Sequence, residues 1–216
     1  MTHESGVQGI PPGSGASPYS TGGGGVTLER LYGATLLAAL LTGDPVPGLG
    51  DEQSVVEVAF QARSKSPVDD FVVSGEPRST TAGQPRRLAI GVRRDPTIAA
   101  GDAEFVHLLS SCLRALTSAP VDFETDRARV AIVVAGPHSG AAEVRRLAEI
   151  ARTQLNSTAF RSAVATPGVC SAKVRARLRW LDEAVAAATP QNPAASEPPG
   201  DLTWRLLRSL ALIERG

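Results

Sequence analysis

The sequence is poor in cysteine, lysine and aromatic residues, and its acidic and basic residues balance to a formal net charge of zero. Its two cysteines, Cys112 and Cys170, are far apart and form no C-x-x-C pair, which favours buried free thiols over a zinc site or a disulfide framework. Lys65 and Lys173 are the only lysines, so a reaction that needs lysine has few places to find one. Without net charge, no overall field draws the chain to nucleic acid or membrane, and any basic surface is a local patch.

Long apolar runs are also absent. No run approaches the roughly 18 residues of a membrane span, and no charged start precedes an apolar stretch as in a signal peptide. We therefore expect a cytoplasmic protein without a membrane span. The apolar fraction of 42% is nevertheless sufficient for the core of one ordinary domain.

Composition divides the chain into four parts. Residues 1–25 are rich in Gly, Ser and Pro and predict a disordered leader, because they have little to bury. Residues 26–188 carry the apolar patterns of a domain, and residues 189–200 form a Pro-rich linker. The amphipathic segment 201–216, "DLTWRLLRSLALIERG", predicts one C-terminal helix.

The periodicity inside the domain predicts an α/β fold. "TLERLYGATLLAALL" (27–41) predicts a helix, and three short apolar segments, "SVVEVAFQ", "DDFVVSG" and "RRLAIGV", predict a three-stranded meander. Next come a helix that Asp102 can cap, the buried strand "ARVAIVVAG", and helices over residues 140–155 and 171–188. We expect a mixed sheet with helices on both faces, since a strand followed by a helix usually extends a sheet in parallel.

Three charged residues stand out in this pattern. Glu29 begins an apolar helical stripe, and Asp70 opens a strand. On the following strand Ala89, Gly91 and Arg93 share one face. That face of small residues leaves room for close packing of a helix, with Arg93 bonding a strand-end aspartate, or for the approach of a polyanion.

The order αβββαβ, with Glu on the helix, Asp on a strand and a cation ending the next, resembles the core of the PD-(D/E)xK nuclease superfamily and its restriction-endonuclease-like fold. More closely, the segments "GGGGVTLERLYGATLLAALLTGDPVPGLG", "VVEVAFQARSKSPVDDFVV", "RRLAIGVRRD", "DAEFVHLL" and "DRARVAIVVAGP" resemble the nuclease-like N-terminal domain of bacterial antiphage and NACHT-type (STAND) NTPase proteins. The resemblance covers roughly residues 22 to 185.

The resemblance implies a degenerate phosphodiesterase (endonuclease) site. Glu29 and Asp70 would hold Mg²⁺, Arg93 stands at the position of the lysine, and Arg93 with Arg94 would bind nucleic acid. Gly91 occupies the (D/E/Q) position and has no ligand atom, whereas arginine cannot act as a base. Asp69 lies on the other strand face and does not simply replace the missing ligand.

Two functions therefore stay open. One is a nuclease-like effector or sensor domain in bacterial antiphage defence that binds nucleic acid and cleaves it weakly. The other is a catalytically inactive interaction module that holds chains together, which would include the formation of a homo-oligomer. No G-x-x-x-x-G-K-[ST] motif occurs, so an NTPase domain would belong to a missing segment or partner chain. The stripe of Trp204, Leu207 and Leu210 or Ala211 predicts that the last helix is the junction to it.

Other polar residues have two interpretations each. His107 and His138 fit structural or surface roles better than catalytic ones, because no nucleophile stands in a suitable sequence context. The basic residues between Lys173 and Arg179 recur at period two, so they spread around their helix and favour a solvated face over a nucleic-acid contact.

Overall fold

The computed structural model describes residues 24–61, 65–68, 70–79, 83–191 and 197–215. The predicted leader therefore lies outside the described residues, apart from the glycines that begin the first helix. The elements follow in the order α1 (Gly24–Thr42), β1 (Gln53–Phe60), β2 (Phe71–Pro77), β3 (Arg86–Arg93), α2 (Ala103–Ser118), α3 (Pro120–Glu124), β4 (Ala128–Ala135), α4 (Ala141–Thr153), α5 (Ser157–Ala165), α6 (Ala172–Ala188), η2 (Thr189–Gln191), α7 (Pro199–Ser209) and β5 (Leu210–Arg215).

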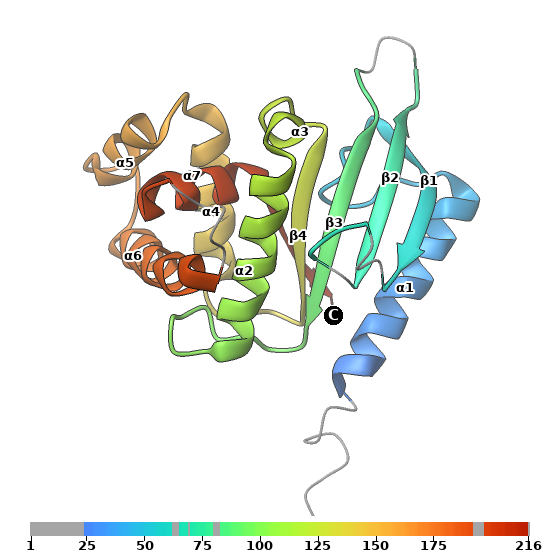
Figure 1. Ribbon diagram of the computed structural model, residues 1–216, viewed down its shortest axis with the longest axis horizontal. Helices are drawn as coiled ribbons and strands as arrows, with labels where there is room; N and C mark the ends of the chain where they lie inside the picture. The colour runs from blue at the N-terminus through green and yellow to red at the C-terminus, as the bar shows by residue number, and fades with distance from the viewer. Residues whose placement is uncertain (1–23, 62–64, 69, 80–82, 192–196, 216) are drawn as a thin grey trace, which may run out of the picture.

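The strands form one mixed five-stranded sheet in the order β1-β2-β3-β4-β5. β1, β2 and β3 are antiparallel to one another, and β4 and β5 continue the sheet in parallel with β3. Figure 1 shows this sheet seen obliquely, with helices on both sides. The predicted α/β class, the meander and the parallel addition of the strand at residues 128–135 are confirmed.

Two hydrophobic cores lie on the two faces of the sheet. On one face, Tyr32 and Leu36 of α1 pack against alternate strand residues such as Phe71, Leu88 and Ile90. On the other face, α2, α4, α6 and α7 cover the residues between them, including Val72 and Ala89. The alternation places Asp70 with Val72, and Arg93 with Ala89, on the face opposite α1.

The boundaries of some helices agree with the sequence prediction, and those of others differ from it. The Asp102 side chain accepts from the Phe105 backbone N–H, which confirms the predicted cap of α2. The helix predicted over residues 140–155 ends at Thr153, and the Asn156 side chain caps a separate helix, α5. A Pro120-initiated helix, α3, was not predicted.

The C-terminal segment differs from the prediction of one helix over residues 201–216. That helix begins at Pro199 and ends at Ser209, and residues Leu210–Arg215 form the edge strand β5 beside β4. Leu206 and Leu207 are buried in the core of the domain, and the half-buried Trp204 donates from Nε1 to the Ala151 carbonyl at 3.2 Å. The end of the chain is thus part of the sheet and its core.

Across the described ranges, no helix combines the length and the apolar character that crossing a lipid bilayer requires.

Candidate functional site

Asp70 and Arg93 meet at one end of the sheet. The Arg93 Nη1 donates to Asp70 Oδ2 at 3.0 Å, and the same oxygen accepts from the Val92 backbone N–H at 2.6 Å. Asp70 precedes β2 and Arg93 ends β3, so the ion pair links the start of β2 to the end of the antiparallel strand β3. The structural alternative for Arg93, a bond to a strand-end aspartate, is confirmed.

The small face of β3 is covered by a helix. A Cβ added to Gly91 would stand 2.6 Å from Cδ1 of Leu108 on α2, closer than carbon atoms approach one another. Close helix packing therefore occupies the space over Gly91 that a polyanion would need. The sequence left both alternatives open, and the structure selects the packing.

Glu29 lies on the helix that covers the other face. It is half-buried and stands one helical turn before Gly33, whose neighbours are the rings of Phe60 and Phe71. Phe71 follows Asp70, so α1 reaches the end of the sheet that holds the ion pair, but it covers the face opposite to Asp70 and Arg93. Arg94 is exposed directly after β3, and Asp69 lies outside the described residues.

These residues do not fit the Mg²⁺ site that the resemblance implies. One of the two Asp70 carboxylate oxygens, Oδ2, is already held by a guanidinium and a backbone N–H. Gly91 has no ligand atom, and Leu108 fills the place of a longer side chain. In the described part of the chain, no group of three or more His, Cys, Asp and Glu residues is arranged to hold a metal ion.

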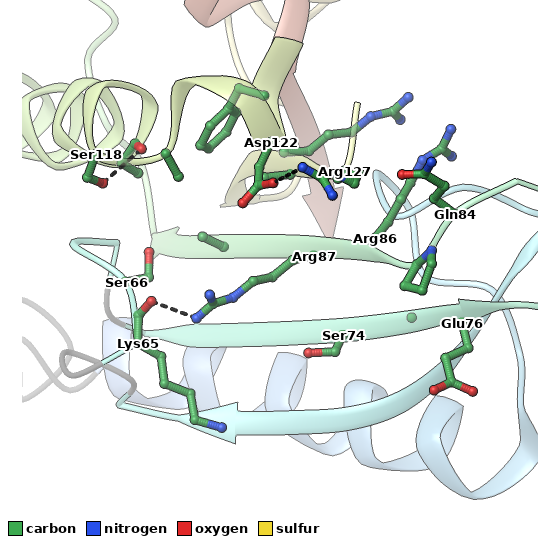
Figure 2. Close-up of a pocket in the computed structure, with 18 of the residues that line it drawn as sticks. Lys65, Ser66, Ser74, Glu76, Gln84, Arg86, Arg87, Ser118, Asp122 and Arg127 are labelled. Carbon is green, nitrogen blue, oxygen red and sulfur yellow. Dashed lines mark hydrogen bonds and ion pairs between the residues drawn. The ribbon is translucent and has the colours of Figure 1, made fainter. Parts of the chain in front are cut away.

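A concave site lies at the amino ends of β3 and β4, which is the opposite end of these strands from Arg93 and its partner Asp70. It is a cleft of about 460 Å³ between the open face of β2 and β3 and the connection from α2 to β4. Ser74 of β2 and its cross-strand partner Arg87 form its floor, and Ala115, Ser118 and Asp122 lie on the helical side. Figure 2 shows these side chains around the opening. Five cations and two carboxylates line the cleft: Lys65, Arg86, Arg87, Arg127 and Arg129, with Glu76 and Asp122.

Two of the cations are held in place by Asp126. Arg86 and Arg129 donate to its carboxylate at 2.8 and 2.7 Å, and Arg86 also pairs with Glu52. Partial burial opposes the charged carboxylate, but the hydrogen bond from Arg129 and the charges of both arginines outweigh it, so the pKa of Asp126 is lowered. Arg86 and Arg129 therefore serve the structure of the cleft wall.

The other three cations are more accessible. Arg127 pairs with Asp122 at 2.7 Å and Lys65 pairs with Glu57, all with side chains more than 40% exposed. The hydrogen bond from Lys65 is the main cause of the lowered pKa of Glu57. Exposed pairs of this kind contribute only about 0.2 to 1 kcal/mol each, so an incoming anion displaces them at little cost.

Arg87 lies between these two pairs. Its Nη2 donates to the Lys65 backbone carbonyl at 2.6 Å, and it forms no ion pair with any carboxylate that the structure describes. Figure 2 shows its side chain along the open face of the strands, with Arg127 toward α3 and Lys65 toward β1. The charge of Arg87 also contributes to the lowered pKa of Glu57, but its guanidinium at the floor of the cleft is in no ion pair with a described carboxylate.

The sequence did not predict this cleft, because its residues lie at the strand ends opposite to Asp70 and Arg93. Four of its five basic residues precede or begin two apolar strands, in "PRRLAIGV" and "DRARVAIVV". Because β3 and β4 are parallel and Arg87 pairs with Ala128, both basic segments meet at one edge of the sheet. The signal was available once the strands were known to be parallel neighbours.

Comparisons with known proteins give no match for this chain. No family model matches the sequence. Neither a curated protein nor a solved structure matches it. The resemblance to PD-(D/E)xK nucleases and the restriction-endonuclease-like fold therefore stay predictions.

Proposed function

We propose that this domain binds single-stranded nucleic acid through its phosphates in the basic cleft and does not cleave it. The observation that carries the proposal is Arg87, an exposed guanidinium in no ion pair with a described carboxylate, with Lys65 and Arg127 on either side. Arginine forms paired hydrogen bonds with phosphate oxygens, and neighbouring cations track a backbone.

The dimensions of the cleft suit a single strand, and its composition offers contacts to phosphates rather than to bases. About 460 Å³ accommodates a short stretch of one backbone. Among the described residues that line it, Phe123 is the one aromatic residue and is buried, so this lining offers no exposed ring for a base to stack on. Binding through phosphates alone is typically weak, with Kd about 10⁻⁴ to 10⁻⁶ M at physiological salt.

The Asp70 region supports binding without cleavage. Its carboxylate is used by Arg93 and the Val92 N–H, and Gly91 is covered by Leu108. This favours an inactive member of a nuclease-like group over a weak nuclease. A role in antiphage defence, and an NTPase domain or partner chain, follow only from the sequence resemblance and belong to the same proposal.

The test is fluorescence anisotropy of a labelled single-stranded oligonucleotide with the protein. We expect binding that Arg87→Gln weakens by about tenfold, as for the loss of one charge-assisted contact. Arg146→Gln is the matched control, because Arg146 is exposed on α4 and already pairs with Glu149. If an acidic peptide with the same net charge as the oligonucleotide displaces it, the cleft is a protein-interaction site instead.

Cleavage is measured separately by gel, with Mg²⁺ or Mn²⁺ added to the same oligonucleotide. We expect the substrate to stay intact. Metal-dependent products that disappear in Asp70→Asn would contradict the inactive site.

A further inference from the structure

The outer face of α1 carries almost no charge. Among the described helices, α1 is the one that packs into the core on its face of the sheet, and in Figure 1 it lies on the side away from α2, α4, α6 and α7. Tyr32 and Leu36 belong to its buried side. Eight described residues of α1 are exposed: Thr27, Arg30, Leu31, Ala34, Leu37, Ala38, Leu41 and Thr42. At about 100° per residue they fall within one continuous arc, in which Arg30 is the one charged side chain.

Three leucines of this arc are in contact with water. Leu31, Leu37 and Leu41 are 63%, 43% and 87% exposed. A surface helix normally carries charged or polar side chains on the face that points away from its core. These leucines recur over about three turns, so they form one apolar stripe with the alanines between them. A continuous apolar stripe of this kind is typical of an interaction surface.

The stripe is symmetric about the middle of the helix. Leu31 and Leu41 are each five residues from Leu36, and Ala34 and Ala38 are each two residues from it. If two copies of α1 pack antiparallel around a twofold axis at that level, Leu31 lies opposite the second copy's Leu41, and Ala34 lies opposite its Ala38. The alanines at the centre permit close approach of the helices, whose axes pack about 8 to 10 Å apart. The face is therefore complementary to itself, as a twofold interface requires.

Charges at the two ends of the helix match in the same register. Arg30 lies beside one end of the stripe, and Asp44 follows the other end of α1. Both are exposed, and within the described ranges neither forms an ion pair, although the Asp44 carboxylate accepts from the Thr42 hydroxyl at 2.7 Å. Antiparallel packing brings Arg30 of each copy close to Asp44 of the other. Parallel packing would instead place the two Arg30 side chains together.

We propose that α1 is a dimer interface, and that a second copy of this chain covers its apolar stripe with its own α1. Residues 1–23, which precede the helix, are mostly Gly, Ser and Pro and offer few apolar side chains for the same purpose. A lipid surface is a poorer match, because helices that lie on membranes carry several basic residues and this arc has Arg30 alone.

This dimer leaves the basic cleft open. α1 packs on the face of the sheet that holds Leu88 and Ile90, whereas Arg87 and Ala89 line the cleft on the opposite face. Two copies joined through α1 therefore carry their clefts on the outer faces of the dimer. Association of the copies and binding of an anion in the cleft use different surfaces, so each is measured without the other.

Sedimentation velocity of the full chain tests the interface. We expect the 22.4 kDa chain to form a dimer with Kd of about 10⁻⁶ to 10⁻⁴ M, because one helix from each copy makes a small interface beside the 1,200 to 2,000 Å² or so of stable complexes. Leu41→Glu should raise the Kd by at least about tenfold, since it places two carboxylates in the apolar contact. Leu155→Glu is the matched control, because Leu155 is 91% exposed and lies away from α1. Circular dichroism should show both variants to be folded.

Two further sets of variants test the antiparallel register. Arg30→Asp and Asp44→Arg should each raise the Kd by about tenfold, and the two together should restore the dimer. A mixture of Ala34→Cys and Ala38→Cys should form an intermolecular disulfide faster than either variant alone, and the native Cys112 and Cys170 are buried. Equally fast crosslinking of Ala34→Cys alone would overturn the antiparallel arrangement.

Three results would overturn the interface itself. One is a full chain that stays monomeric up to about 1 mM, a concentration that detects even weak association. The second is a dimer that Leu41→Glu and Leu155→Glu affect equally. The third is a monomer that floats with phosphatidylcholine vesicles, which would make a lipid surface the occupant of the stripe. Arg87→Gln should leave the dimer unchanged, so failure of this inference and failure of the proposed function are distinguishable.

Discussion

The carboxylate of Asp70 holds the Arg93 guanidinium at 3.0 Å and the Val92 backbone N–H at 2.6 Å through a single oxygen. A residue that the sequence suggests as a metal ligand is therefore a structural acceptor in this protein. It fixes the start of β2 against the end of β3, and both partners are largely shielded from water.

Asp70→Asn removes the charge from this acceptor. We expect a loss of about 1 to 3 kcal/mol in the free energy of unfolding, because the hydrogen bonds are charge-assisted and partly buried. Asp51→Asn, at an exposed position before β1, is the control and should change little. Urea denaturation measures both, and equal stability of the two variants would show that the Asp70 contacts contribute nothing.

Gly91→Ala introduces a Cβ 2.6 Å from Leu108 Cδ1. Overpacking of this kind costs about 1 to 3 kcal/mol. In a Leu108→Ala background the clash disappears, so the same substitution should cost clearly less there, which a double-mutant cycle by urea denaturation measures. A cost that is the same in both backgrounds contradicts the packing of α2 on β3. For the same reason, Gly91→Glu with Arg93→Lys should destabilise the fold and create no nuclease.

Leu206 on α7 is buried, and its truncation tests whether the C-terminal segment belongs to the core. Leu206→Ala should lower the free energy of unfolding by about 2 to 5 kcal/mol, as for other buried leucines. Leu155→Ala is the matched control, since Leu155 is 91% exposed. If thermal melting shows the two variants to be alike, α7 is a detachable junction, as its amphipathic sequence suggested.

Asp126 should make stability depend on pH in the acid range. Its pKa in the folded state is lowered, so the unfolded state binds the proton at higher pH, and stability falls as the pH drops below the ordinary Asp value of about 3.9. Asp126→Asn should remove part of this fall. Asn also tolerates the φ of +60° at this position, so backbone strain does not cause the expected change in pH dependence. Urea midpoints between pH 3 and 6 that fall equally in Asp126→Asn and Asp51→Asn would contradict the role of Asp126.

The sequence predicted most elements of the fold because their periodicities are local. The alternation of "RRLAIGV" and the apolar run "ARVAIVV" gave β3 and β4, and Asp102 marked the start of α2. It did not give β5, because "LALI" continues the apolar stripe of α7, and a short apolar segment fits a helix or a strand equally well. Only the exposed edge of β4 decides between them.

The candidate site was predicted less well, for a similar reason. Sequence spacing placed Asp70 and Arg93 on strand faces but could not show whether a helix or a ligand covers Gly91, since Leu108 approaches from a separate element. The basic cleft depends on the register of β3 against β4, which brings Arg87 beside Ala128 and Arg127 nearby. Such long-range pairing is not encoded in either segment alone.

The most direct test of nucleic-acid binding in the cleft is the salt dependence of oligonucleotide affinity. If Lys65, Arg87 and Arg127 each contact a phosphate, log Kd should rise with log salt concentration with a slope of about 2, from about 0.7 per contact on a single strand. The variant Lys65→Gln/Arg87→Gln/Arg127→Gln should lose nearly all of this slope while retaining the melting temperature of the parent within a few degrees. A parent that does not bind at low salt, or a folded triple variant with the slope of the parent, would contradict the proposed function.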